Sequence, residues 1–97
     1  MTEVTSRLRR SLSRWANAPE QEAVELQGSL RTVTLRPRGG VPALEAELYD
    51  GSGTITIVWL GRRRIAGIEP GRQIRVIGRI GVHDNQRLMF NPRYELR

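Results

Sequence analysis

Two hydrophobic periodicities divide the chain near residue 18. In the first segment apolar side chains recur every three or four positions, which aligns them on one face of a helix. These side chains are Val4, Leu8, Leu12 and Trp15. Pro19 ends the pattern, because the residue before a proline disfavours helical backbone angles. The two patterns predict an amphipathic helix over residues 1–18 and a β domain over residues 19–97.

Beyond residue 22 apolar and polar side chains alternate, which is the period of a half-buried β-strand. The alternation predicts five strands, over residues 23–35, 43–49, 54–60, 72–81 and 87–96. In the first strand the apolar positions change parity between Leu30 and Val33. A parity change within one strand indicates a β-bulge near residues 30–32. Such a bend lets one strand pair with two different neighbours around a small barrel.

Turn-forming residues separate the predicted strands. Residues 50–53, Asp-Gly-Ser-Gly, predict a hairpin turn, and residues 36–42 and 82–86 are expected to form loops. Residues 61–68 are expected to form a short helix or a turn. Pro92 cannot donate a backbone hydrogen bond, so it is expected at an edge or a bulge of the last strand.

Together these elements predict an all-β fold, namely a five-stranded OB-fold barrel with Greek-key topology that follows a short N-terminal α-helix. The long, bent first strand and the short connection between the third and fourth strands favour this architecture. Closure also suits a chain of 97 residues, because a closed barrel removes exposed sheet edges. A five-stranded SH3-like barrel is the alternative, but its shorter strands fit the pattern less well.

The charged residues indicate a polyanionic partner. The chain has 16 basic residues, all of them arginine, and 10 acidic residues, for a net charge of +6. A guanidinium group pairs with phosphate through two hydrogen bonds and stacks on bases, so a nucleic acid is the expected partner. A GC-rich genome, whose codons favour arginine, would explain the absence of lysine equally well.

Several kinds of chemistry are disfavoured by the residues that the chain lacks. It has no cysteine and one histidine, His83, so disulfides, cysteine zinc sites and histidine clusters are excluded and no cofactor is expected. Without lysine the chain cannot contain an ATP-binding P-loop. His83 beside Asp84 is interpreted as turn polarity, because adjacent residues of a hairpin point apart. The sequence therefore predicts a non-catalytic protein.

Apolar runs are short throughout the chain. The longest covers residues 57–60, far below the ~20 residues that span a bilayer. No apolar segment follows the N-terminal arginines as a secretory signal would require. The sequence thus predicts a cytoplasmic protein without a membrane partner.

Three segments resemble OB-fold nucleic-acid-binding domains. They are LYDGSGTITIVW at residues 48–59, EPGRQIRVIGRI at residues 69–80 and LMFNPRYE at residues 88–95. The chain is similar in particular to the wedge domain of RecG-type branch-migrating DNA helicases, and to small stand-alone OB-fold proteins of actinobacteria. The resemblance covers residues 24–96. It implies a module that binds single-stranded or branched nucleic acid, with DNA favoured over RNA.

Candidate binding residues follow from where OB barrels hold single strands. The usual site is the outer face of the second and third strands, between the loop joining the first two strands and the loop joining the last two. The side chains expected to contact phosphates or frame the site are Arg31, Arg36, Arg38, Arg62, Arg63, Arg64, Arg79, His83 and Arg87. Tyr49 is expected to stack on a base. Trp59 is expected either to stack on a base or to lie in the core or at the rim of the barrel.

Two carboxylates complicate this interpretation. Glu45 and Glu47 point outward from the second strand, on the expected binding face, where they would repel phosphates. Either the strand avoids them, or they pair with Arg31 or another arginine, or this face binds a protein. The alternative function is therefore a protein-interaction or assembly module. It would use the acidic face or the N-terminal helix, whose Leu8, Leu12 and Trp15 could contact a partner or a second copy of the chain.

Overall fold

The structure is a computed structural model that describes residues 23–97. Its strands are β1 (Ala23–Leu35), β2 (Ala43–Tyr49), β3 (Thr54–Leu60), β4 (Gln73–His83), β5 (Gln86–Phe90) and β6 (Arg93–Leu96). The predicted helix over residues 1–18, with Leu8, Leu12 and Trp15, lies outside the described residues, and so does the predicted boundary at residues 18–19. No helix long and apolar enough to cross a bilayer occurs within residues 23–97.

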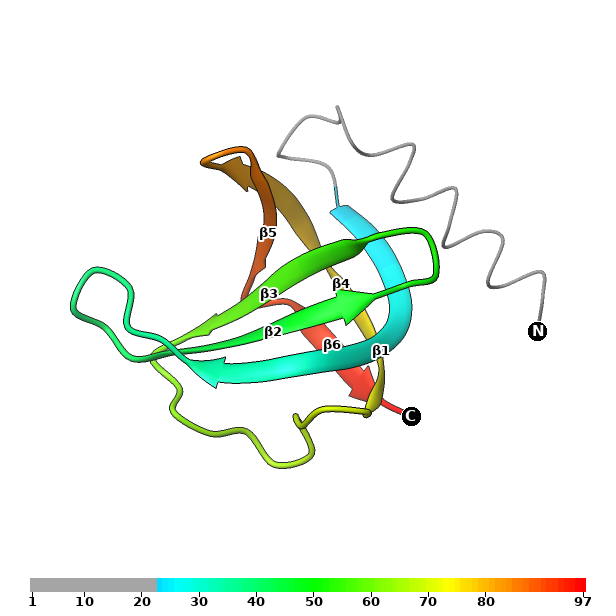
Figure 1. Cartoon of the computed structure of the whole chain (residues 1–97), viewed down its shortest axis with the longest axis horizontal. Helices are drawn as coiled ribbons and strands as arrows, with labels where there is room; N and C mark the ends of the chain where they lie inside the picture. Colours follow the sequence, from blue (N-terminus) through cyan, green and yellow to red (C-terminus); the bar gives the residue numbers. More distant parts are fainter. Residues whose placement is uncertain (1–22) are drawn as a thin grey trace.

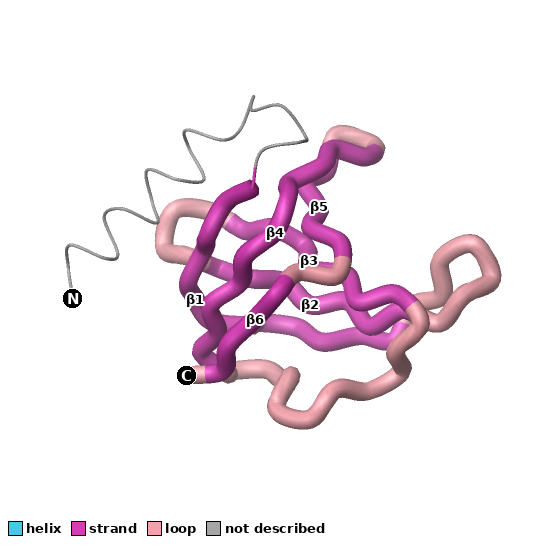
Figure 2. The backbone as a smooth tube through the Cα atoms, turned by 180° about the vertical axis from the view of Figure 1, so that it is seen from behind, coloured by secondary structure: helices cyan, strands magenta, loops and turns pink. Residues whose placement is uncertain are grey.

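Five of the six strands close into a ring (Figures 1 and 2). The order is β1-β2-β3-β5-β4, and β1 pairs again with β4 to complete the circle. The β3–β5 pair is parallel and every other pair is antiparallel. The described chain is therefore all-β, with the five-stranded ring that the sequence predicts. The added strand β6 pairs with β4 beside β5.

The first strand serves two neighbours because it is bulged. Its N-terminal half pairs with β4 as far as Ser29, and its C-terminal half pairs with β2. The register shifts between Leu30 and Val33, which confirms the bulge predicted from the parity change. At Gly28 strand β1 approaches the end of β2 so closely that an added Cβ atom would lie 2.0 Å from the carbonyl oxygen of Tyr49.

The last predicted strand, over residues 87–96, is wrong as a single element. The structure divides it into β5 and β6 at Asn91 and Pro92. Asn91 adopts a φ of 50°, and its side-chain oxygen accepts a hydrogen bond from the Leu60 amide at 2.9 Å. Pro92 has no amide hydrogen, so the ladder cannot continue through it. The proline thus lies at a break between strands.

Both connections of β4 consist of turns. The sequence placed this strand at residues 72–81, whereas it extends to His83 and turns back through Asp84 and Asn85, whose φ angles of 52° and 62° suit a two-residue hairpin. The connection from β3 to β4 contains no helix, so the turn alternative applies to residues 61–68. Buried Ile65 and Ile68 join the barrel core from this connection.

The barrel interior is filled by aliphatic side chains from every strand of the ring. Its most deeply buried members are Leu26, Leu30, Leu48, Ile55, Ile57, Ile74, Val76 and Met89. A second, smaller cluster lies on the outer side of β3 and consists of Ala43, Val58 and Leu88, with Phe90 packed against them. Strand β3 is therefore buried on both faces at its far end, as its continuous apolar run suggested.

Candidate nucleic-acid interface

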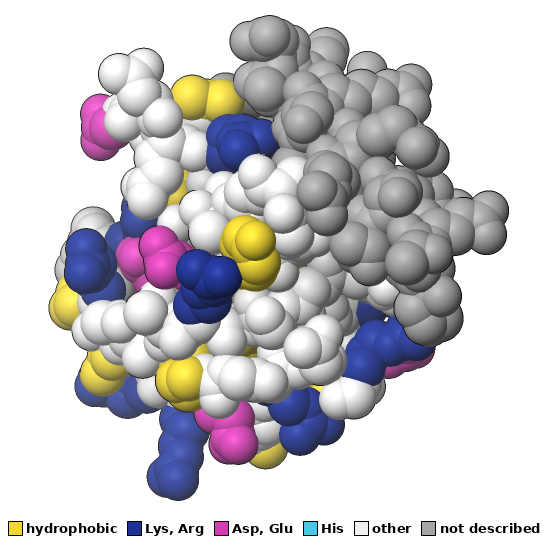
Figure 3. Space-filling model, turned by 45° about the vertical axis from the view of Figure 1, so that its right-hand side comes forward, with side chains coloured by type: hydrophobic (Ala, Val, Ile, Leu, Met, Phe, Trp, Pro, Cys, Tyr) yellow, Lys and Arg dark blue, Asp and Glu magenta, His cyan; other side chains and the backbone are white. Residues whose placement is uncertain are grey.

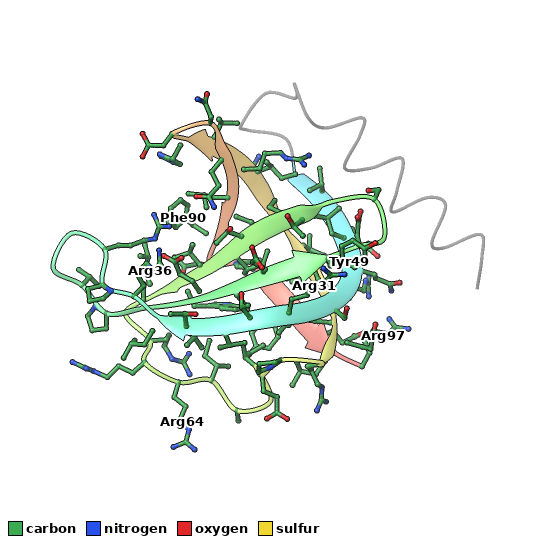
Figure 4. All side chains as sticks on the ribbon, viewed as in Figure 1. Arg31, Arg36, Tyr49, Arg64, Phe90 and Arg97 are labelled. Carbon is green, nitrogen blue, oxygen red and sulfur yellow. The ribbon has the colours of Figure 1, made fainter. Side chains whose placement is uncertain are left out.

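A polar hollow of about 330 Å³ lies on the outer face of the barrel. Its lining comes from β1, β2, β3 and the start of β5: Thr32, Thr34, Arg36, Glu45, Ala46, Glu47, Thr56 and Gln86. Figure 4 shows Arg36 and Phe90 toward the β1–β2 loop, residues 36–42, and Arg31 with Tyr49 toward the β2–β3 turn. This is the face on which OB barrels hold single strands. From here on, the term outer face refers to this hollow together with the side chains that surround it.

At the β2–β3 end of the outer face, Arg31 covers Tyr49. The Arg31 guanidinium carbon lies 3.8 Å from the centre of the tyrosine ring, which is cation–π geometry. Arg31 reaches the ring because it belongs to the β1 bulge, opposite the end of β2. The Tyr49 hydroxyl donates to the Gly51 carbonyl oxygen at 3.3 Å, which holds the ring in place. The pair presents a flat, positively charged surface.

At the other end, Arg38 forms an ion pair with Glu45. The Arg38 Nε donates to Glu45 Oε2 at 2.5 Å, and the two side chains are 32% and 12% exposed. Two backbone hydrogen bonds between Arg38 and Val41 fold the β1–β2 loop back so that Arg38 faces β2. The guanidinium carbon also lies 5.7 Å from the centre of the Phe90 ring. Glu45 thus pairs with an arginine, one of the alternatives left open by the sequence.

The centre of the outer face holds uncharged donors and one further carboxylate. Glu47 Oε1 accepts a long hydrogen bond from Thr32 Oγ1 at 3.4 Å, and Gln86 Nε2 donates to Thr56 Oγ1 at 3.3 Å. In Figure 3, acidic side chains on this side of the molecule are bordered by basic ones. Within residues 23–97 no three histidine and carboxylate side chains gather as metal ligands would.

The structure brings five of the predicted site residues to the outer face or its margin: Arg31, Arg36, Arg38, Tyr49 and His83. His83 meets Phe90 edge to face, with ring centres 5.7 Å apart. His83 pairs with Gln86 at the end of the β4–β5 hairpin, so both side chains leave the same side of it. Arg87 follows Gln86 and so points to the opposite side of the hairpin.

The other predicted residues lie elsewhere. Trp59 is 5% exposed and belongs to the barrel core, and its ring packs edge to face against the exposed Tyr94, so it is not available for stacking on a base. The consecutive arginines 62–64 are exposed in the β3–β4 connection, and Arg64 among them points away from the barrel at the bottom of Figure 4. Arg79 is exposed on β4, opposite Ala23 of β1 and across the ring from β2.

Sequence reasoning missed the threonines of the hollow, although the signal was present. The bulge places Val33 and Leu35 on the inner side of β1, and so turns Thr32 and Thr34 outward. Thr56 lies on the outer side of β3 by the same alternation. The sequence prediction lacks these hydroxyls because threonine is neither charged nor aromatic, the two properties from which the site residues were predicted.

Two arginines on the β4–β6 side of the barrel, Arg75 and Arg97, are engaged in ion pairs. Arg75 Nε lies 2.6 Å from Glu25 Oε2, and Glu95 lies 3.7 Å from both Arg75 and Arg97. The hydrogen bond and charge of Glu25 raise the pKa of the Arg75 guanidinium above its ordinary value. By contrast, Arg31 and Arg36 have no acidic partner within ion-pair distance among the described residues. Arg31 and Arg36 are therefore cations at the outer face that no described carboxylate neutralises.

Comparison with known proteins identifies the fold. The sequence matches no protein-family profile and no curated protein. Similar solved structures include a Replication Protein A heterotrimer bound to ssDNA, with 16% identity and a TM-score of 0.63 over 81% of this chain and 60% of that chain. RecG bound to a three-way DNA junction shows 20% identity and a TM-score of 0.65, over 78% of this chain and 11% of that chain.

A single OB domain gives the most complete mutual coverage of the three structures compared. The solution structure of an OB domain from Thermoplasma acidophilum shares 12% identity with this chain, at a TM-score of 0.63, over 84% of this chain and 81% of that chain. At such identities the similarity concerns the fold. The chain is an OB-fold domain, as its strand pattern and resemblance predicted.

Proposed function

We propose that this protein is a non-catalytic OB-fold module that binds single-stranded or branched nucleic acid on its outer face. The observation that carries the proposal is the position of two arginines that have no acidic partner among the described residues. Arg31 and Arg36 flank a polar hollow on the β2–β3 side, while Arg75 and Arg97 on the β4–β6 side are held by carboxylates. The OB fold and the net charge of +6 support it.

In the proposed complex, different parts of the nucleic acid contact the rim and the floor of the hollow. Arg36 and Arg31 contact phosphates at the two ends, where guanidinium groups form charge-assisted hydrogen bonds. The Arg31–Tyr49 pair offers a flat surface on which one base stacks, worth about 1–3 kcal/mol. The Arg38–Glu45 pair lowers the repulsion that Glu45 would exert on a phosphate.

DNA is favoured over RNA in this proposal. Two of the similar structures, Replication Protein A and RecG, contain ssDNA and a DNA junction respectively. The distinction is tested by comparing deoxy and ribo oligonucleotides of the same sequence. Equal or tighter binding of the ribo form would contradict the DNA preference while leaving the nucleic-acid proposal intact.

The proposal is tested by fluorescence anisotropy with a labelled oligothymidine dodecamer. If Arg31, Arg36 and Arg38 each neutralise one phosphate, log Kobs falls with log salt at a slope of about −2. Arg31→Ala or Arg36→Ala should flatten the slope by about 0.7, because one phosphate contact is lost. Arg93→Ala, on β6, removes the same charge outside the hollow and should leave the slope unchanged. Absence of binding at micromolar protein and low salt would refute the proposal.

The same titration tests the arginines of the β3–β4 connection. If residues 62–64 also contact phosphates, the wild-type slope steepens to about −4. Replacing all three with alanine would then restore a slope of about −2. If the triple variant has the same slope as the wild type, residues 62–64 do not belong to the binding site. Arg79 and Arg87 are tested in the same way.

A further inference from the structure

The floor of the hollow contains a carboxylate that phosphate binding does not explain. Among the described residues, Glu47 accepts one long hydrogen bond, from Thr32 Oγ1 at 3.4 Å, whereas Glu45 is held by Arg38 at 2.5 Å. An ionised carboxylate accepts hydrogen bonds and cannot donate them. It repels phosphate, so the part of a nucleic acid that enters here must bring hydrogen-bond donors.

We infer that Glu47 recognises guanine, an inference that rests on the proposed function. The Watson–Crick edge of guanine carries two adjacent donors, N1–H and the N2 amino group, which match the two oxygens of one carboxylate. Adenine and cytosine each present one amino donor beside a ring-nitrogen acceptor. Thymine presents one donor between two carbonyl oxygens. Only guanine meets the carboxylate with two donors side by side.

The rest of the hollow suits the same base. The guanine O6 atom, which adjoins N1–H, is an acceptor and needs a donor from the protein. Gln86 Nε2 and the Thr34 and Thr56 hydroxyls line the hollow beside Glu47 and can donate. The volume of about 330 Å³ falls within the usual range of small-ligand sites, about 300–1,000 Å³.

The charges around the hollow favour different positions for the sugar-phosphate backbone and for a base of a bound strand. Arg36 stands at one end of the hollow and Arg31 at the other, where phosphates would be attracted. Glu47 on the floor turns phosphates away and accepts base donors. A single strand is thus oriented with its backbone toward the arginines and one base edge toward β2, which is the geometry that direct base recognition in single strands requires.

Anisotropy titrations of the full chain with three dodecamers test this inference. One is oligothymidine, one has guanine at every third position, and one has hypoxanthine there, which keeps N1–H and O6 but lacks the N2 amino group. The wild type should bind the guanine dodecamer roughly 5- to 100-fold more tightly than oligothymidine, the range of one bidentate base contact. The hypoxanthine dodecamer should fall between them.

Variants assign the preference to Glu47. Glu47→Gln removes the charge and one acceptor, so the guanine preference should fall to less than about twofold while affinity for oligothymidine is kept or increased. Retained oligothymidine binding also shows that the variant is folded. Glu95→Gln, on β6, makes the same change outside the hollow and should keep the preference.

The possible results separate the two proposals. Equal binding of the guanine and thymine dodecamers by the wild type would overturn guanine recognition and leave the proposed function standing. A guanine preference that survives Glu47→Gln would also overturn the role of Glu47. Failure of all three dodecamers to bind would overturn the proposed function and this inference together.

Discussion

The close contact between β1 and β2 makes a sharp prediction for Gly28→Ala. An added Cβ atom would lie 2.0 Å from the Tyr49 carbonyl oxygen and 2.8 Å from its carbon, where about 3.5 Å is the closest comfortable separation. Because the obstacle is backbone, no side-chain rotation can relieve it. The strands must move apart, beside the Ser29–Tyr49 pair that begins the β1–β2 ladder.

The cost can be assembled from its parts. Overpacking of this kind costs about 1–3 kcal/mol, and a strained ladder hydrogen bond adds about 1 kcal/mol. Replacing a strand glycine with alanine returns about 0.5–1 kcal/mol through the lower entropy of the unfolded chain. The net loss is about 2 kcal/mol, which lowers Tm by roughly 8–16 °C in a domain of this size.

Thermal and urea unfolding followed by circular dichroism measure this loss, with Gly78→Ala as the matched control. Gly78 also lies in the β1–β4 ladder, but a Cβ atom there meets Met89 Sδ at 2.9 Å and Pro92 Cβ at 3.2 Å. The flexible methionine can move, so Gly78→Ala should cost less. The reasoning is wrong if Gly28→Ala proves as stable as Gly78→Ala or as the wild type.

Two further predictions concern the strand break and the ion pair. Asn91→Ala and Asn91→Gly both lose the hydrogen bond to the Leu60 amide, but only alanine is strained at a φ of 50°, so Asn91→Ala should be less stable than Asn91→Gly by about 1 kcal/mol in urea unfolding. Equal stabilities would show that the backbone angle costs nothing here. Glu45→Gln removes the carboxylate that competes with phosphate for Arg38 and should raise oligothymidine affinity by up to about fivefold at low salt, whereas Glu95→Gln should not. A decrease in affinity would mean that the ion pair itself positions Arg38 for binding.

The strands were predictable because each depends on local alternation. The bounds of β1, β2 and β3 agree with the sequence pattern, and the parity change between Leu30 and Val33 located the bulge.

The break at Asn91 was missed because apolar side chains keep alternating through it, at positions 88, 90, 92, 94 and 96. In the structure the inward parity changes at the break: Met89 of β5 faces the core while Leu88 lies in the outer cluster, and the inward positions of β6 are Tyr94 and Leu96. Pro92 interrupts the ladder and Asn91 turns the chain with its positive φ, so the proline did signal an irregularity, but the sequence pattern placed it within one strand rather than between two.

The location of the proposed binding face was predictable in outline, but the contacts between its side chains were not. Fold resemblance pointed to the outer side of β2 and β3, and Arg31, Arg36 and Tyr49 do lie there. The Arg38–Glu45 pair depends on how the β1–β2 loop folds back, which no local pattern reports. Trp59 was ambiguous because apolar residues flank it on both sides, so alternation could not assign its face.

The way the ring closes determines how the domain can acquire its structure. Hairpins join β1 to β2 and β2 to β3, but the circle is completed only by the β1–β4 and β3–β5 pairs, which connect segments distant in sequence. The chain loses loop-closure entropy before these long-range pairs form and contribute their stabilising contacts. Folding is therefore slow compared with that of a helical chain of equal length. During synthesis the Val58–Phe90 pairing must wait until β5 has left the ribosome, and until then the nascent β1–β3 sheet exposes the apolar residues that will become its core.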